Sequence, residues 1–380
     1  MAVQQGYGKM AGTDALVFAY DTGDAVNSYK GRPTTNYGPA SFGNWGTEGS
    51  AERIATGNTY NGQPTYNCRT VVGESWRGID TTISGLRTAA GSSGTVTMSC
   101  MVRNNNPSNY SMYAYIGHDF GSTRTIVANS NWQKVQWTVN QSSMNNDYVE
   151  FRPYTNNASV YLEMTMPMVE VNVSYASQFT AGTRSATEGL LDLTGTASID
   201  LSNVSFDSDA GIVFDGTDDR IIFPPGSLPT IGTNDFTLEF VCKNTRTDRY
   251  NHFFSVLDQY HISFKSYNEN GLLYVYRTSE LSTTSSIPAY IPSRNDYYHI
   301  VAKRQGDNMQ IYINGESQGL KTGWGDVSID NNLYNSYIGW GAGTEYSGGH
   351  YAIAKIYNKA LTDAEVSANF KNYKTRFNIA

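Results

Sequence analysis

The sequence of 380 residues is poor in charged side chains, which make up 16% of it. Its formal net charge is −7 and it holds no cluster of Lys and Arg, so binding to nucleic acid or to an anionic membrane surface is disfavoured. No apolar run approaches the ~18 residues that a membrane-spanning helix needs. Residues 1–10 also lack the apolar core of a signal peptide, so we expect neither membrane insertion nor ordinary secretion.

Cysteine is scarce as well: Cys68, Cys100 and Cys242 lie far apart in the chain. Their odd number and long spacings provide neither a disulfide framework nor a metal-binding knuckle. Cys100 and Cys242 lie in alternating apolar stretches, which predicts buried free thiols in sheet cores. Free thiols are typical of a protein that folds in a reducing cytoplasm.

What the sequence does contain favours strands and tight turns. Aromatic residues reach 13%, with 28 Tyr, and there are 36 Gly. Residues 95–102 alternate between apolar and polar side chains, the pattern of a half-buried strand. Asn314-Gly315 between two short apolar stretches predicts a type I′ hairpin. A capping box at Thr362 and Glu365 predicts one helix, at about Asp363–Asn372.

Motifs of catalysis and metal binding are absent from the sequence. The five His residues have no metal-ligand spacing, and neither G-x-S-x-G nor H-E-x-x-H occurs. We therefore expect no catalytic residues and no cofactor. Asp215, Asp218 and Asp219 are an alternative calcium site, since hard cations prefer clustered oxygen ligands, but we interpret them as turn residues that cap backbone N–H groups.

Several aromatic residues lie in loop-like Gly and Asn contexts, where their rings would be exposed. Such rings stack on the C–H faces of sugars, and they also anchor subunit interfaces, which is the interpretation that we favour. Trp132 and Trp137 are instead predicted to be core residues. The candidates for glycan binding or an interface are Trp45, Trp324, Tyr334, Trp340 and Tyr346.

Four elements, in order, resemble the concanavalin A-like (laminin G-like) lectin and glucanase sandwiches. They are Ile212–Ile221, Phe236–Phe240, Met309–Gly315 and Ala354–Glu365. Residues 37–175 resemble the jelly-roll, carbohydrate-binding-module-like sandwiches. The resemblance therefore implies an all-β protein with two antiparallel β-sandwiches and a short C-terminal helix.

The domain organisation implied by this resemblance is discontinuous. Residues 14–36 and 176–380 are predicted to form the concanavalin A-like sandwich, with residues 37–175 inserted as the jelly roll, since a surface loop tolerates an inserted domain whose ends lie close together. Residues 1–13 are predicted to be an N-terminal anchoring segment.

The stretches at 16–24, 182–194 and 199–206 resemble structural proteins of tailed bacteriophages, cyanophages especially. This implies a virion protein, such as a fibre, neck protein or capsid appendage, assembled in the host cytoplasm. Its partners would be other virion proteins and further copies of this chain, for example in a trimer, together with a host-surface glycan. A glycan-binding receptor lectin is the alternative. A glycoside hydrolase is disfavoured because the Glu-x-Asp-x-x-Glu strand of laminarinase-type relatives is missing.

Overall fold

The chain forms two compact units. The computed structural model describes residues 13–70, 78–155, 159–207, 211–246, 250–256, 262–267, 272–277, 286–290, 296–324, 329–330, 332–341 and 343–380. Unit 1 comprises the described residues within Met1–Arg32, Ser185–Asp207 and Gly211–Ala380, and unit 2 those within Pro33–Arg184. Except for Thr13, the predicted anchoring segment lies outside the described residues.

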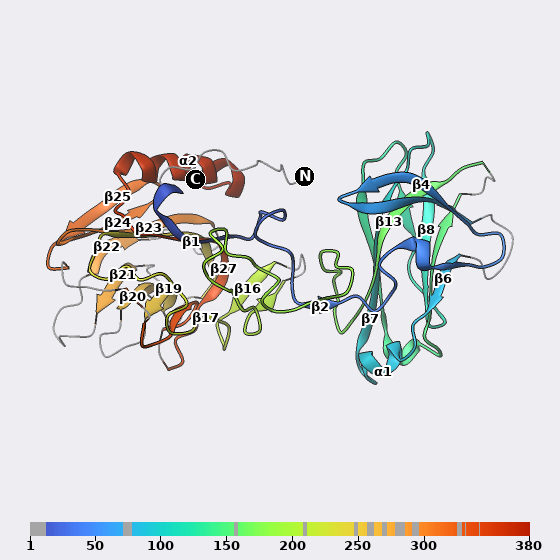
Figure 1. Ribbon diagram of the computed structural model, residues 1–380, viewed down its shortest axis with the longest axis horizontal. Helices are drawn as coiled ribbons and strands as arrows, with labels where there is room; N and C mark the ends of the chain where they lie inside the picture. The colour runs from blue at the N-terminus through green and yellow to red at the C-terminus, as the bar shows by residue number, and fades with distance from the viewer. Residues whose placement is uncertain are drawn as a thin grey trace. The chain divides into compact units, whose positions relative to one another are not determined.

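Unit 1 is built from two antiparallel sheets (Figure 1). The eight-stranded sheet runs, in spatial order, through β15 (Ser205–Phe206), β16 (Ile212–Asp215), β27 (Gly348–Tyr357), β18 (Phe236–Asn244), β23 (Tyr298–Gln305), β24 (Asn308–Ile313) and β25 (Glu316–Lys321), with β1 (Leu16–Asp21) also paired to β27. The six-stranded sheet runs through β17 (Ile221–Phe223), β26 (Ser336–Ile338), β19 (Asn251–Val256), β20 (Ile262–Tyr267), β21 (Leu272–Arg277) and β22 (Ser286–Tyr290). These sheets confirm the predicted all-β fold.

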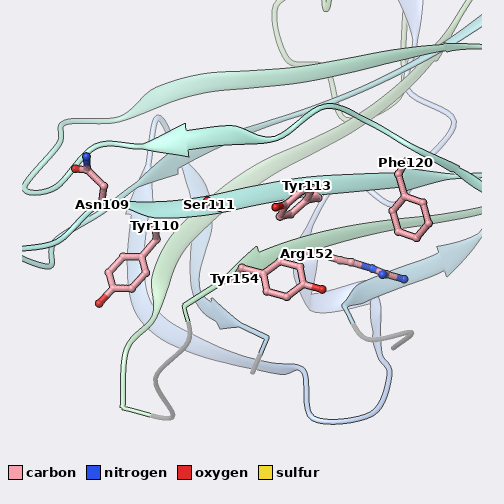
Figure 2. A pocket seen from close by; sticks show the side chains of 7 residues that line it. All are labelled: Asn109, Tyr110, Ser111, Tyr113, Phe120, Arg152 and Tyr154. Atoms are coloured by element: carbon pink, nitrogen blue, oxygen red, sulfur yellow. The ribbon is translucent and has the colours of Figure 1, made fainter. Parts of the chain in front are cut away.

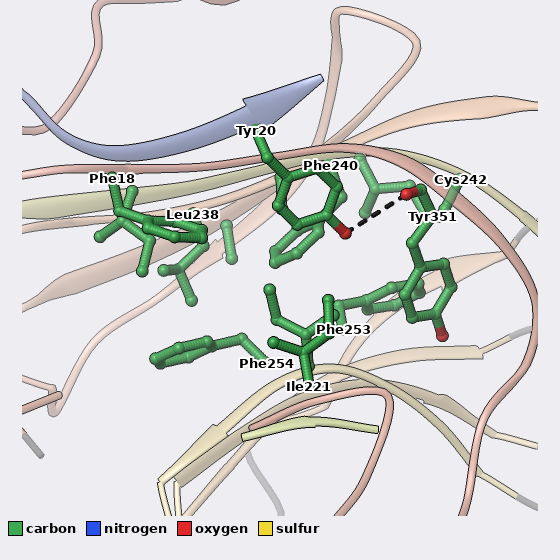
Figure 3. Close-up of a cluster of buried hydrophobic side chains, with 14 of the residues drawn as sticks. Phe18, Tyr20, Ile221, Leu238, Phe240, Cys242, Phe253, Phe254 and Tyr351 are labelled. Atoms are coloured by element: carbon green, nitrogen blue, oxygen red, sulfur yellow. Dashed lines mark hydrogen bonds between the residues drawn. The ribbon is translucent and has the colours of Figure 1, made fainter. Parts of the chain in front are cut away.

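The core of unit 1 lies between these sheets and includes a strand from the start of the chain. Figure 3 shows Phe18 and Tyr20 of β1 among side chains of β18, β19 and β27. Phe18 packs edge-on against Phe223 with ring centroids 5.1 Å apart, and the Tyr20 hydroxyl donates to the Tyr351 carbonyl at 3.2 Å. Segments more than 300 residues apart in the sequence therefore share one core.

The hairpin and the capped helix predicted for this unit are both present, but the helix ends later than predicted. Asn314 and Gly315 adopt φ of 51° and 80° between β24 and β25, which confirms the hairpin. The helix α2 has the predicted capping box but spans Asp363–Phe377, five residues beyond the predicted end. It continues because its last turns pack on the sheet, where Tyr373 is buried against Val241 and Ile353.

A buried polar network joins α2 to the outer face of the eight-stranded sheet. Glu239 Oε1 lies 2.7 Å from His299 Nε2, the Tyr357 hydroxyl donates to Glu239 Oε2 at 2.6 Å, and Asn369 of α2 donates to the same oxygen at 3.3 Å. Burial alone would raise the pKa of Glu239, but the contact with His299 and the charge of Lys355 outweigh it and lower the pKa to about 2. The carboxylate is thus the acceptor that holds the helix on the sheet.

We expect Glu239→Gln to loosen α2, because the amide leaves buried donors without an acceptor, at a cost of about 1–3 kcal/mol. Native-state hydrogen exchange of the α2 amides in the full chain should speed up correspondingly. Because folding lowers the pKa of Glu239, its stabilising contribution is present above its unfolded value near 4.5 and is lost as pH falls towards 2. Glu316→Gln, on exposed β25, is the matched control and should leave α2 exchange unchanged.

Unit 2 is a second antiparallel β-sandwich. Its six-stranded sheet runs through β10 (Arg124–Ile126), β8 (Tyr110–Ile116), β12 (Tyr148–Tyr154), β6 (Ile79–Thr82) and β3 (Gly46–Thr47), with β9 (Asp119–Phe120) paired to β8. Its five-stranded sheet runs through β11 (Gln133–Asn140), β7 (Thr95–Arg103), β13 (Leu162–Val171), β5 (Gln63–Arg69) and β4 (Glu52–Tyr60). The short β2 (Thr34–Thr35) pairs with β14 (Thr183–Arg184), and the short helix α1 spans Leu86–Ala90.

The alternation predicted for residues 95–102 places alternate side chains of β7 in the core of unit 2. Val96, Met98, Cys100 and Val102 of β7 all face the core between the two sheets, which confirms the predicted strand and its alternation. The prediction that the strand is half-buried is wrong, because Thr97 and Ser99 of its other face are buried as well. All three cysteines of the protein are buried and free, as predicted. Burial raises the pKa of Cys100, which keeps its thiol protonated and makes it a packing residue.

Candidate functional site

The outer face of the six-stranded sheet of unit 2 carries an aromatic pocket. On β8, Met112 and Ala114 point into the core, so Tyr113 between them points outward. On β12, Val149 and Phe151 face the core in the same way, which leaves the alternate residues of that strand outside. Because β8 and β12 are neighbours, their outward side chains meet on one surface.

The pocket has a volume of about 490 Å³. It is lined by Asn109, Tyr110, Ser111, Tyr113, Phe120, Arg152 and Tyr154 (Figure 2). Tyr113 and Tyr154 meet edge to face with ring centroids 5.1 Å apart, and Figure 2 shows Phe120 and Arg152 near the opposite end from Tyr110. The lining thus combines four aromatic rings with amide, hydroxyl and guanidinium groups.

Arg152 is held in place on several sides. Its Nη2 lies 2.6 Å from Glu150 Oε2, and both side chains are almost fully buried. Its guanidinium carbon lies 5.2 Å from the ring centroids of Tyr115 and Phe120. Gly78 leaves the space for the carboxylate, since a Cβ there would lie 2.2 Å from Glu150 Oε1. The pocket therefore contains a fixed cation with its own counter-ion.

A tight turn between β8 and β9 positions Phe120. Gly117 and His118 have φ of 59° and 97°, and positive φ is unusual for a residue with a side chain such as His118. Gly121 packs against Trp137, where a Cβ would lie 2.3 Å from the indole Cδ1. These contacts hold Phe120, which remains 55% exposed, at the wall of the pocket. Strained backbone of this kind concentrates at functional sites.

Further carboxylates lie on the same face beyond Glu150. Asp80 of β6 pairs in register with Glu150, and Glu48 accepts a hydrogen bond from the Tyr148 hydroxyl at 2.7 Å. Burial, and next the charge of Glu48, raise the pKa of Asp80. Burial likewise raises the pKa of Glu150, against the opposing hydrogen bond from Arg152. This part of the sheet therefore carries several carboxylates around the Glu150–Arg152 ion pair.

The aromatic residues proposed from the sequence divide into buried and accessible ones. Trp45 and Trp324 are each 2% exposed, so their interpretation as exposed loop rings is wrong. Each folds back into the core of its own unit, where it buries a large apolar area. Trp132, predicted to be a core residue, is only half-buried, stacked on Tyr60 at 4.6 Å with Arg103 5.0 Å from its ring.

Two of the proposed residues do come together in unit 1. The backbones of Trp340 and Tyr346 pair in an isolated antiparallel β-bridge. The guanidinium carbon of Arg220 lies 5.6 Å and 5.5 Å from their ring centroids. Arg220 also donates to the Tyr346 hydroxyl at 3.1 Å. Tyr334 is 41% exposed. Trp340 and Tyr346 are both half-buried, so this aromatic cluster is a second, partly accessible group.

The three aspartates of unit 1 occupy one turn. Carboxylate oxygens of Asp215, Asp218 and Asp219 lie within 4.8 Å of one another. The buried Asp219 accepts from the Asp215 N–H at 2.8 Å and from the Ser205 hydroxyl at 3.3 Å, and Asp215 accepts from two N–H groups of the turn. These hydrogen bonds fit the turn interpretation, and calcium binding at this turn stays the alternative.

We expect Asp219→Ala to lower the stability of the chain by about 1–3 kcal/mol, because the buried Asp219 carboxylate accepts the partly buried hydrogen bonds from the Asp215 N–H and the Ser205 hydroxyl. Asp218→Ala, a matched change of an exposed carboxylate in the same turn, should alter it by less than about 0.5 kcal/mol. Thermal unfolding of both variants in EDTA measures this difference. Equal effects of the two changes would contradict the turn interpretation.

The pocket in unit 2 was not predicted from the sequence, although the pattern of one of its strands indicates part of it. Residues 148–154 read Tyr-Val-Glu-Phe-Arg-Pro-Tyr, so apolar residues at every second position imply that Glu150, Arg152 and Tyr154 share the other face. The same logic applies to Tyr113. What the sequence does not contain is the pairing of β8 with β12, which brings the two sets together.

Comparison with known proteins supports the fold of unit 1. Residues 215–367 match the family model of the Concanavalin A-like lectin/glucanases superfamily, so this part of the chain is similar to a concanavalin A-like domain. No curated protein matches the chain.

Three solved structures are similar to parts of this chain. One is domain 4 of an extracellular arabinanase from Geobacillus stearothermophilus in complex with arabinotriose, with 17% identity, a TM-score of 0.36, and coverage of 45% of this chain and 80% of that chain. The binding domain of Paraclostridial Mosquitocidal Protein 1 shows 20% identity and a TM-score of 0.38, and the match covers 48% of this chain and 49% of that chain. A heptameric SAP-like pentraxin from Limulus polyphemus shows 20% identity and a TM-score of 0.32, and the match covers 41% of this chain and 78% of that chain.

Among the described residues, no helix is long and apolar enough to cross a membrane.

Proposed function

We propose that this protein binds glycans, and that the pocket on the outer face of the six-stranded sheet of unit 2 is its binding site. The observation that supports this most directly is the lining itself. Four aromatic rings offer faces for the C–H groups of a sugar, and Asn109, Ser111 and the tyrosine hydroxyls offer donors and acceptors for its hydroxyls. The volume of about 490 Å³ lies within the usual range of ligand sites.

The proposal is one of binding without hydrolysis. Glycoside hydrolysis uses a pair of carboxylates that flank the scissile bond. The seven described residues that line the pocket include none. The lectin and glucanase family matched by residues 215–367 adds general support for sugar recognition, although the pocket lies in the other unit.

Tyr154→Ala and Tyr113→Ala are each expected to weaken glycan binding about tenfold or more, because each removes a stacking surface. A glycan array followed by isothermal titration of the best oligosaccharide measures this. Trp340→Ala, which removes an accessible ring in unit 1, is the matched control and should bind as the unaltered chain does. Equal loss in the control, or full binding by both tyrosine variants, would place the site elsewhere.

A second proposal concerns where the protein acts. We propose that it is a structural protein of a tailed-bacteriophage virion, assembled in the host cytoplasm, with other virion proteins and further copies of this chain as partners. The support is the resemblance of residues 16–24, 182–194 and 199–206 to such proteins. The three free, buried cysteines are compatible with folding in a reducing compartment. A virion adhesin and a glycan-binding protein are compatible roles.

Electron microscopy of parent virus particles, labelled with an antibody to this chain, tests the virion role. We expect label at a defined position on the head, neck or tail, with particles treated with pre-immune serum as the control. Intact particles without label, from a lysate in which the chain is detected as free protein, would count against this role and leave the glycan-binding proposal standing.

A further inference from the structure

The charge of the pocket distinguishes between classes of glycan. Arg152 is the one charged residue among the seven that line it. A cation that recognises an acidic sugar must be free to pair with the ligand's carboxylate or sulfate. Arg152 is already paired with Glu150 at 2.6 Å, and the two side chains are 5% and 0% exposed. The ion pair therefore presents no net charge to a ligand in the pocket.

Arg152 is also prevented from turning towards an acidic ligand. Its guanidinium carbon lies 5.2 Å from the ring centroids of both Tyr115 and Phe120, and it would leave these contacts if it moved. Such a movement would also strand the buried carboxylate of Glu150 without its counter-charge, which is costly. Arg152 is thus a fixed hydrogen-bond donor and part of the pocket's shape.

The surroundings add negative charge to the same face of the sheet. Asp80 lies beside Glu150 on the next strand, and Glu48 contacts Tyr148. Arg124, on the strand beyond β8, donates from Nε and Nη2 to the Gln136 carbonyl in the other sheet, at 3.1 Å and 3.0 Å. The side chain of Arg124 is therefore directed towards the other sheet, whereas Asp80 and Glu48 add carboxylates beside the Glu150–Arg152 pair.

We propose that the pocket selects uncharged glycans and rejects those that carry carboxylate or sulfate groups, with Glu150 as the residue that sets this selectivity. This inference rests on the proposed glycan-binding function and narrows its ligand class. Neutral sugars are recognised here by ring stacking and neutral hydrogen bonds, whereas an acidic sugar meets a neutralised arginine and nearby carboxylates.

The first test uses the full, unaltered chain. Titration with neutral oligosaccharides of glucose, xylose, galactose and mannose is compared with titration with sialyllactose, oligogalacturonate and sulfated galactan oligosaccharides, each at 0.05 M and ~0.5 M NaCl. We expect at least about tenfold tighter binding of a neutral ligand, with little dependence on salt. Binding of an acidic ligand that is equally tight or weakens with salt would overturn the inference while glycan binding stands. Binding to neither group would remove the proposed function and the inference with it.

The second test changes Glu150 alone. Glu150→Gln keeps the shape and frees the charge of Arg152, so affinity for acidic oligosaccharides is expected to rise about tenfold relative to neutral ones. Glu163→Gln is the matched control, because Glu163 pairs with Arg103 on the other sheet at 2.7 Å. It should leave the selectivity unchanged.

Circular dichroism of each variant establishes whether it is folded before binding is measured. A folded Glu150→Gln variant with unchanged selectivity would overturn the role of Glu150. If that variant does not fold, the double variant Glu150→Gln/Arg152→Gln in the full chain replaces it, because it removes both charges of the buried pair and strands neither. The affinity of that variant for a neutral ligand should fall by less than about tenfold. A larger loss, together with binding of acidic ligands by the unaltered chain, would show that Arg152 recognises the charge of the ligand and would overturn the inference.

Discussion

The two-residue period of the β-strand is the constraint on which this structure depends. Along β18, β8 and β12, one row of side chains faces the core of its sandwich and the alternate row faces the other side of the sheet. In unit 1 the second row of β18 carries Glu239, which holds α2. In unit 2 the second row of β8 and β12 carries the rings and the arginine of the pocket. A slip of one residue in either strand would move these groups into the core.

Buried charges on the outer faces are the second feature common to both units. Glu239 and Glu150 are each fully buried, and each has a basic partner within hydrogen-bond distance. Desolvation of such groups is expensive, and only specific partners offset it. The two pairs differ in their surroundings. Asn369 of α2 contacts the first, whereas Arg152 of the second lies against the rings of Tyr115 and Phe120 and lines the pocket. That difference makes the first pair structural and the second part of a candidate site.

The two units contribute differently to the proposed function. Unit 1 carries the lectin-like family match and a half-buried aromatic cluster around Arg220. Unit 2 carries the pocket, with its strained turn at His118 and its exposed Phe120. The family match therefore falls in one unit, and the pocket lies in the other. Fold and function are separable in this way because a site is a local arrangement on a shared scaffold.

Local patterns in the sequence determined much of this protein. The alternation of 95–102, the Asn314-Gly315 hairpin and the capping box of α2 each depend on residues close in the chain, and each is found where it was predicted. The end of α2, the burial of Trp45 and Trp324, and the meeting of Tyr113 with Tyr154 were decided only by the tertiary structure. The physical reason is that strand pairing and core packing join residues distant in sequence, and no local pattern specifies which strands become neighbours or which loop ring fills a core.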